Sequence, residues 1–71
     1  MTRHITIHRK GNTFMFYESD SLSSYRGDKL LAERSYDDMT VIMPDIAQIN
    51  DGDHTNISVD DKVLKAYRII E

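Results

Sequence analysis

The chain has 71 residues, no cysteine and a formal net charge of −3, with 39% hydrophobic and 30% charged residues. A chain of this length forms one domain, residues 1–71, that buries only about 60% of the surface exposed when unfolded, so its stability margin is narrow. Without cysteine it can have no disulfide framework and no thiolate metal site. No run approaches the roughly 20 apolar residues of a membrane-spanning helix, and the N-terminal residues lack the apolar core of a signal peptide. We therefore expect a cytoplasmic protein.

A β-hairpin is predicted near the N-terminus. Apolar and polar side chains alternate over residues 3–9, and the aromatic-rich run 13–18 suits a second strand. Gly11-Asn12 between them fits a two-residue type II′ turn. Such a turn places Lys10 opposite Thr13 and Ile7 opposite Phe16. In that register one face of the hairpin carries the side chains expected to form the core, Ile5, Ile7, Phe14 and Phe16.

The middle of the chain has two interpretations. Residues 28–36 either begin a short helix capped by Asp28 or alternate as a strand. Residues 39–43 have the apolar character of a buried strand, and Pro44 would end it because proline cannot donate a ladder hydrogen bond. Pro44 can also open a helical turn that reaches Gln48.

The C-terminal run predicts an amphipathic helix. Ser58 suits the N-cap, and Asp60 and Asp61 then fall in the first turn, where the helix dipole favours negative charge. The rival interpretation of this C-terminal run is two strands joined by a turn at residues 60–62. At about 100° per residue one arc of the helix holds the apolar side chains Val59, Val63, Ala66, Tyr67 and Ile70. We expect an α+β fold, in which a small antiparallel sheet begins with the N-terminal hairpin and the helix packs on one face.

Charge is segregated along the chain. Residues 1–17 have a net charge of +3 and residues 62–71 of +2, whereas residues 18–61 hold eleven acidic residues against three basic ones, a net charge of −8. A surface of one sign steers oppositely charged partners towards it. We expect the following residues to form an acidic surface that binds a basic partner: Glu33, Asp37, Asp38, Asp45, Asp51, Asp53, Asp60 and Asp61.

The patterns of metal and catalytic sites are not met. An EF-hand loop starting at Asp51 fails because Asn56 and Lys62 occupy the positions of the required Gly and Glu. Residues 50–53 instead predict a turn. His4 and His8 share one face of the predicted strand roughly 13 Å apart, too far for one ion. With three Gly in the chain, neither a phosphate-binding loop nor a nucleophile elbow occurs. We expect no cofactor, no metal and no enzymatic activity.

The leading hypothesis is a non-enzymatic protein-binding module, an inhibitor or adaptor, whose acidic middle segment engages a basic protein. One version is a phage-like inhibitor that mimics DNA, because duplex DNA presents about one charge per 1.7 Å and an acidic ridge competes for the same surface. The charges of both signs also allow a homodimer. The alternative is a nucleic-acid-binding module that uses its basic hairpin, through Arg3, His8, Arg9 and Lys10.

Overall fold

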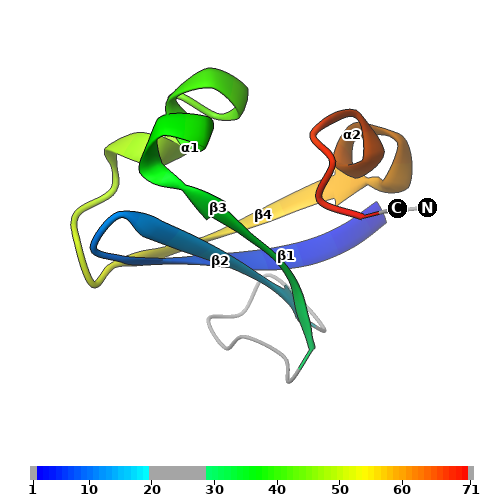
Figure 1. Cartoon of the computed structure of the whole chain (residues 1–71). Helices are drawn as coiled ribbons and strands as arrows, with labels where there is room; N and C mark the ends of the chain where they lie inside the picture. The colour runs from blue at the N-terminus through cyan, green and yellow to red at the C-terminus, as the bar shows by residue number, and fades with distance from the viewer. Residues whose placement is uncertain (1, 20–28, 71) are drawn as a thin grey trace.

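The computed structural model describes residues 2–19 and 29–70. Its four strands form one antiparallel sheet in the order β3-β2-β1-β4, and both α-helices lie on the same side of it (Figure 1). The predicted α+β class is confirmed, as are the N-terminal hairpin and the C-terminal helix. In chain order the elements are β1 (Thr2–Lys10), β2 (Thr13–Ser19), β3 (Leu30–Ser35), α1 (Tyr36–Ile42), the 3-10 turn η1 (Ile46–Gln48), β4 (His54–Asp60) and α2 (Asp61–Ala66).

The N-terminal hairpin has the predicted register. Lys10 lies opposite Thr13, and Ile7 lies opposite Phe16. Gly11 has φ +60, the left-handed value that a type II′ turn requires at its first position. The four side chains expected in the core are all fully buried. Because burial of each contributes about 1.5–3 kcal/mol, this quartet is a main source of stability.

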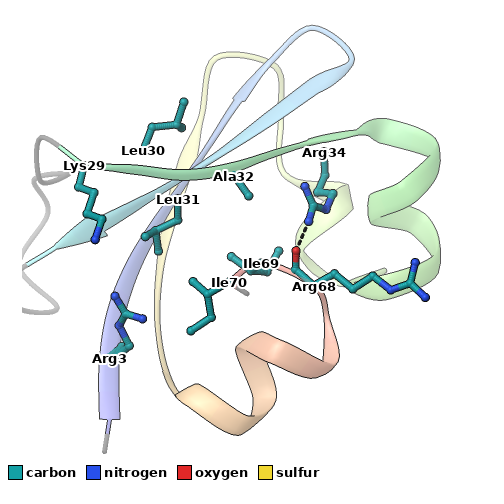
Figure 2. A pocket seen from close by; sticks show the side chains of 9 residues that line it. All are labelled: Arg3, Lys29, Leu30, Leu31, Ala32, Arg34, Arg68, Ile69 and Ile70. Atoms are coloured by element: carbon teal, nitrogen blue, oxygen red, sulfur yellow. Dashed lines mark hydrogen bonds between the residues drawn. The ribbon is translucent and has the colours of Figure 1, made fainter.

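The segment before α1 forms the edge strand β3, so the strand interpretation of this part of the chain is confirmed. A register shift between Phe16 and Tyr17 introduces a bulge in the β2–β3 ladder. As a result Leu31, rather than Leu30, turns towards the C-terminal segment (Figure 2), and Leu30 is 45% exposed. The alternative helix cap at Asp28 lies outside the described residues.

The strand predicted over residues 39–43 is wrong, because Tyr36–Ile42 forms the helix α1. Met39 and Met43 are one helical turn apart and both are buried in the core. A strand would have placed Val41 on the same face as these two methionines, whereas the helix leaves it 80% exposed.

Local signals in the sequence mark both ends of α1. The Ser35 hydroxyl accepts a hydrogen bond from the Asp38 N–H at 3.1 Å and caps the first turn, which also carries Asp37. Met43 leaves the helical conformation, with φ −143 and ψ 69, and the helix ends there, since the α conformation is disfavoured for the residue before Pro44. The helical turn considered for residues 44–48 is present as η1.

The C-terminal helix begins later than predicted. Strand β4 continues through Ser58, so the predicted cap at Ser58 is wrong. Asp60 is the N-cap instead, and its carboxylate accepts from the Val63 N–H at 2.8 Å. The predicted apolar arc is also wrong, because Val59 belongs to the strand and Ala66 is exposed. The hydrogen bonds to β1 along the whole strand outweigh the helical pattern of its last residues.

The end of α2 determines which C-terminal side chains reach the core. After the cap at Tyr67, Arg68 has φ +60, a position that helices usually give to glycine. The Arg68 N–H donates to the Lys65 carbonyl and the Ile69 N–H to the Leu64 carbonyl, each at 2.9 Å, which is the Schellman pattern. This turn directs Ile69 back beside Leu64, and both side chains are buried.

The two faces of the sheet are covered differently. The core face lies under α1, η1 and α2, whereas the second face carries none of the described helices (Figure 1). The second face holds cross-strand pairs of β1 and β4. His4 Nδ1 lies 2.7 Å from Ser58 Oγ, and the His8 and His54 rings stack with centroids 5.2 Å apart. Thr6, between these pairs, is fully buried.

Candidate functional site

The eight acidic residues expected to form one surface are distributed over the molecule. Asp60 and Asp61 lie where β4 ends and α2 begins, at the far end of β4 from His54, and the seven-residue strand separates its two ends by roughly 20 Å. Glu33 lies on β3, and Asp45 lies between α1 and η1. The remaining four, which we call the acidic end, lie near the β1–β2 turn: Asp37, Asp38, Asp51 and Asp53.

Two contacts bring the segments of the acidic end to the same turn. The Asp51 carboxylate accepts a hydrogen bond from the Gly11 N–H at 2.6 Å, across 40 residues of sequence. The Tyr36 N–H, directly before Asp37, donates to the Asn12 carbonyl at 2.8 Å. The start of α1 and the turn before β4 therefore flank the β1–β2 turn.

The turn predicted at residues 50–53 is confirmed. The Asp53 N–H donates to the Asn50 carbonyl at 2.9 Å, and Gly52 has φ +85, as the third residue of a type II turn requires. Arg9 extends the sheet ladder into this turn. Its N–H donates to the Asp53 backbone carbonyl, and its carbonyl accepts from the Gly52 N–H, each at 2.9 Å. The backbone that carries Asp51 and Asp53 is thus held against β1.

The charge of the acidic end has no ion-pair partner in the described part of the molecule. Its four aspartates are all exposed. Within residues 2–19 and 29–70 the ion pairs both involve Arg3, which lies 2.7 Å from Glu18 and 3.5 Å from Asp61, at the other end of β1. The aspartates of the acidic end are therefore available to an external cation.

An exposed apolar side chain accompanies these charges on α1. Val41 is 80% exposed and lies one helical turn beyond Asp37 and Asp38, on the same side of the helix. This helix surface combines two carboxylates with a β-branched apolar group. Protein interfaces combine charged rims with apolar contacts in this way.

Arg9, predicted as a nucleic-acid contact, is half-buried and bound to other parts of the fold. Its Nη1 donates to the Ile49 carbonyl at 2.7 Å, and its Nε donates to the Gly11 carbonyl at 3.0 Å. Its guanidinium lies over the rings of Phe14 and Tyr36, 5.6 and 5.0 Å from their centroids. Arg9 thereby joins the hairpin, the start of α1 and the segment before β4.

The other predicted basic contacts are separated from one another. Arg3 is paired with carboxylates at the far end of β1, and the His8 ring stacks on His54. Lys10 is exposed beside the turn. The hairpin therefore presents no continuous basic surface among its described residues.

A basic groove that the sequence did not predict opens between β3 and the C-terminal segment (Figure 2). Its volume is about 600 Å³, and no acidic residue is among the described residues that line it. The basic residues come from three separate segments of the chain, so no single sequence motif predicts them. They are Arg3, Lys29, Arg34 and Arg68, and the apolar part of the lining includes Leu31, Ile69 and Ile70.

The four basic residues of the groove differ in how their charges are used. Arg34 donates to the carbonyls of Glu33 and Arg68, so its guanidinium is fixed, and no carboxylate of the described residues forms an ion pair with it. Arg3 is neutralised by its two ion pairs. Lys29 and Arg68 are exposed and have no ion pair within the described residues. Figure 2 shows Lys29 and Arg3 on one side of the groove and Arg34 and Arg68 on the other, with the Arg68 side chain extending away from it.

Neither a metal site nor a membrane span emerges from the described structure. No three His, Asp, Glu or Cys side chains of residues 2–19 and 29–70 are placed to hold an ion together. Of the helices in these residues, none has the length and apolar character needed to cross a bilayer. No family model matches the chain, and no curated protein or solved structure is significantly similar to it.

Proposed function

We propose that this protein is a non-enzymatic, cytoplasmic binding module whose acidic end contacts a basic surface of a partner protein. The observation that carries the proposal is the convergence of four exposed aspartates from two segments on one turn, without an ion pair among the described residues. Charge complementarity of this kind accelerates association and weakens as salt screens it.

A DNA-binding protein is the class of partner that fits best. Its Lys and Arg side chains are arranged to neutralise phosphates at about one charge per 1.7 Å of duplex, and closely spaced carboxylates compete for the same side chains. Asp37 and Asp38 are adjacent in the first turn of α1, while Asp51 and Asp53 extend from a hydrogen-bonded turn. Val41 adds an apolar contact that phosphates do not offer. The protein would act as an inhibitor by occluding the DNA-binding surface.

Neutralising the acidic end is expected to abolish capture of the basic partner. The variant combines Asp37→Asn, Asp38→Asn, Asp51→Asn and Asp53→Asn, which keep a side-chain oxygen for the Gly11 hydrogen bond while removing four charges. The measurement is a pull-down from nuclease-treated lysate, with retained proteins identified by mass spectrometry and then purified for titration. We expect at least a tenfold loss of affinity, which corresponds to about 1.4 kcal/mol.

The matched control removes the same number of charges from the other predicted acidic residues. It combines Glu33→Gln, Asp45→Asn, Asp60→Asn and Asp61→Asn; asparagine is as good an N-cap as aspartate, so α2 is retained. The control should keep most of the affinity, and duplex DNA should displace the partner from the wild-type protein. Equal losses in the two variants would show that net charge, rather than the acidic end, determines binding.

A second candidate function is binding of single-stranded nucleic acid in the basic groove instead of on the hairpin. The specific observation is that no described acidic residue lines the groove, and that three of its four basic residues, Lys29, Arg34 and Arg68, have no ion pair within the described residues. In addition, Arg68 holds a left-handed backbone conformation that costs a non-glycine residue about 1–2 kcal/mol. Helix ends usually place glycine at this position, so the charge at position 68 can be removed without disturbing the turn.

If the groove binds phosphates, the double variant Lys29→Gln/Arg68→Gly should weaken binding of a labelled oligothymidylate. Glycine relieves the strain at position 68 while it removes the charge, so the fold is retained. Loss of two phosphate contacts should reduce the salt slope of log K by about 1.4, measured by fluorescence anisotropy. The control Lys10→Gln/Lys62→Gln removes two exposed lysines outside the groove and should leave the slope unchanged. Equal effects of the two variants would exclude the groove.

A further inference from the structure

Within the described residues, strand β4 is an edge strand that, before Asp60, lacks the charges, proline and bulges that usually prevent edge pairing. It pairs with β1 over His54–Asp60 and has no other neighbouring strand among the described residues. Before Asp60 it contains no Lys, Arg, Asp, Glu or Pro, and no bulge interrupts its ladder with β1. Natural proteins normally protect an exposed edge with charges, proline or bulges, because an unprotected edge pairs with another strand.

The opposite edge of the sheet is protected. Strand β3 contains the charged residues Glu33 and Arg34, and a bulge interrupts its ladder with β2. The Arg34 side chain also donates to the Glu33 carbonyl at 2.6 Å. The contrast between the two edges indicates that β4, rather than β3, is the edge that can pair with another strand.

The ladder with β1 determines which backbone groups face the unpaired side of β4. The backbone of Arg9 forms hydrogen bonds with the backbone of Asp53 and Gly52. The odd-numbered residues of β1 therefore direct their backbone N–H and C=O groups towards β4. In the observed register they lie opposite the odd-numbered residues of β4, such as Ile57. The even-numbered residues of β4, including His54 and Ser58, therefore direct their N–H and C=O groups away from β1.

In one symmetric register, the outward N–H and C=O groups of two β4 strands lie opposite each other, and so do the side chains at the ends of the strand, His54 and Asp60. With a two-fold axis at Ile57, His54 of each copy lies opposite Asp60 of the other, and both are even-numbered residues of the second face. The Asp60 Oδ1 caps α2 by accepting from Val63, which leaves Oδ2 to accept from the imidazole N–H. The pair occurs twice, once on each side of the axis.

Apolar side chains lie along the same edge on the core face. A groove of about 490 Å³ is lined by residues that include Ile46, Ile57, Val59, Val63 and Tyr67, all half-buried. In this register Ile57 contacts Ile57 of the second copy, and Val59 lies opposite its Thr55. Pairing would therefore cover apolar surface as well as satisfy backbone groups.

We propose that two copies of this chain pair through their β4 edges, antiparallel and centred on Ile57, to form a symmetric dimer with one continuous sheet. The occupant of the edge is a second copy because the end pair of His54 and Asp60 is self-complementary about the axis. The dimer goes beyond the proposed function and does not depend on it. It would carry two acidic ends, because Asp51 and Asp53 directly precede β4 in each copy.

The first test measures mass in solution by sedimentation velocity at several concentrations. The wild-type protein should approach twice 8.3 kDa as concentration rises. Ser58→Pro removes an outward N–H that β1 does not use and should give a monomer. Ser58→Ala loses the same hydroxyl contact with His4 but keeps the N–H, and should remain a dimer. A wild-type monomer at the highest soluble concentration would overturn the proposal.

The second test fixes the register and does not depend on the proline variant folding. The chain has no cysteine, so Ile57→Cys introduces one thiol per copy. At the centre of the axis two such residues form a non-hydrogen-bonded pair with Cα atoms about 4.5 Å apart, within the range for a disulfide. Mild oxidation should cross-link this variant and leave the β3-edge control Glu33→Cys unlinked. Cross-linking of Glu33→Cys alone, or of neither variant, would overturn the proposed interface.

Discussion

Phe16→Ala is expected to destabilise the protein by about 3–5 kcal/mol, the usual range for removing a buried phenylalanine. Phe16 is fully buried in β2, where it lies opposite Ile7 of β1 and Ala32 of β3. Its side chain belongs to the same core cluster as Met39 and Leu64. A chain of this length has a total stability of about 4–11 kcal/mol, so the variant should be largely unfolded at 37 °C when the wild type is near the lower limit.

Urea unfolding followed by far-UV circular dichroism would measure this loss. Phe16→Leu keeps most of the buried volume and should cost about 1 kcal/mol. Thr13→Ala, at an exposed position of the same strand, should change stability by about 0.5 kcal/mol or less. If Phe16→Ala were no more destabilising than Phe16→Leu, the packing of the three strands around this ring would have to be different.

The hairpin could be predicted from the sequence because the interactions that determine it are local. The alternation of Ile5 and Ile7, the glycine at the turn and the aromatic positions of β2 all lie within one short segment. Each signal points to the same register, and the four apolar side chains on one face of the hairpin are fully buried. Agreement among local signals of this kind is what makes a prediction reliable.

Helix α1 was missed because five apolar and β-branched residues do not distinguish a strand from a helix. The Ser35 cap and the aspartates of the first turn were present as signals, since Ser followed three residues later by an acidic residue, before an apolar run, indicates a helix start. What decides the outcome is tertiary packing, which buries Met39 and Met43 and leaves Val41 exposed.

Strand β4 shows the limit set by contacts between distant residues. Its odd-numbered positions Thr55, Ile57 and Val59 alternate with polar residues, a pattern that is typical of a strand. The same residues also fit the beginning of a helical arc, and only pairing with β1 at the other end of the chain decides between the two. The predicted helix consequently started too early.

The distribution of charge along the sequence did not indicate which of the acidic residues come together in the fold. The contact between Asp51 and Gly11 spans 40 residues, and it is this contact that places two aspartates beside the hairpin turn. Asp60 and Asp61, which belong to the same acidic segment, are carried to the opposite end by β4. The basic groove is assembled from three segments and left no local signal at all.

Arg9→Ala is expected to cost about 2–4 kcal/mol, although Arg9 was predicted from the sequence to contact nucleic acid. Its guanidinium donates two hydrogen bonds to carbonyls, and bonds from a charged group contribute about 1.5–3 kcal/mol each before the losses of fixing the side chain. Its position over the rings of Phe14 and Tyr36 adds about 0.5–1 kcal/mol. Removal also leaves the half-buried Ile49 carbonyl without this donor.

The loss should be concentrated where Arg9 joins three parts of the fold. Amide hydrogen exchange is expected to accelerate at Gly52 and Asp53 before it does so in the centre of β1 and β2, because the turn before β4 loses its anchor. Lysine cannot reproduce the planar fork, so Arg9→Lys should recover only part of the stability. Lys10→Ala, next to it but exposed, should stay within about 0.5 kcal/mol of the wild type.

The comparison of Arg9 with Lys10 separates a structural role from a binding role. A structural Arg9 lowers the urea midpoint when replaced and leaves the binding of the folded fraction unchanged, because its guanidinium is already engaged by Ile49 and Gly11. The opposite result, an unchanged midpoint with weaker oligonucleotide binding, would mean that the side chain leaves these carbonyls to meet a phosphate. In that case the hairpin, rather than the groove beside β3, would be the nucleic-acid surface.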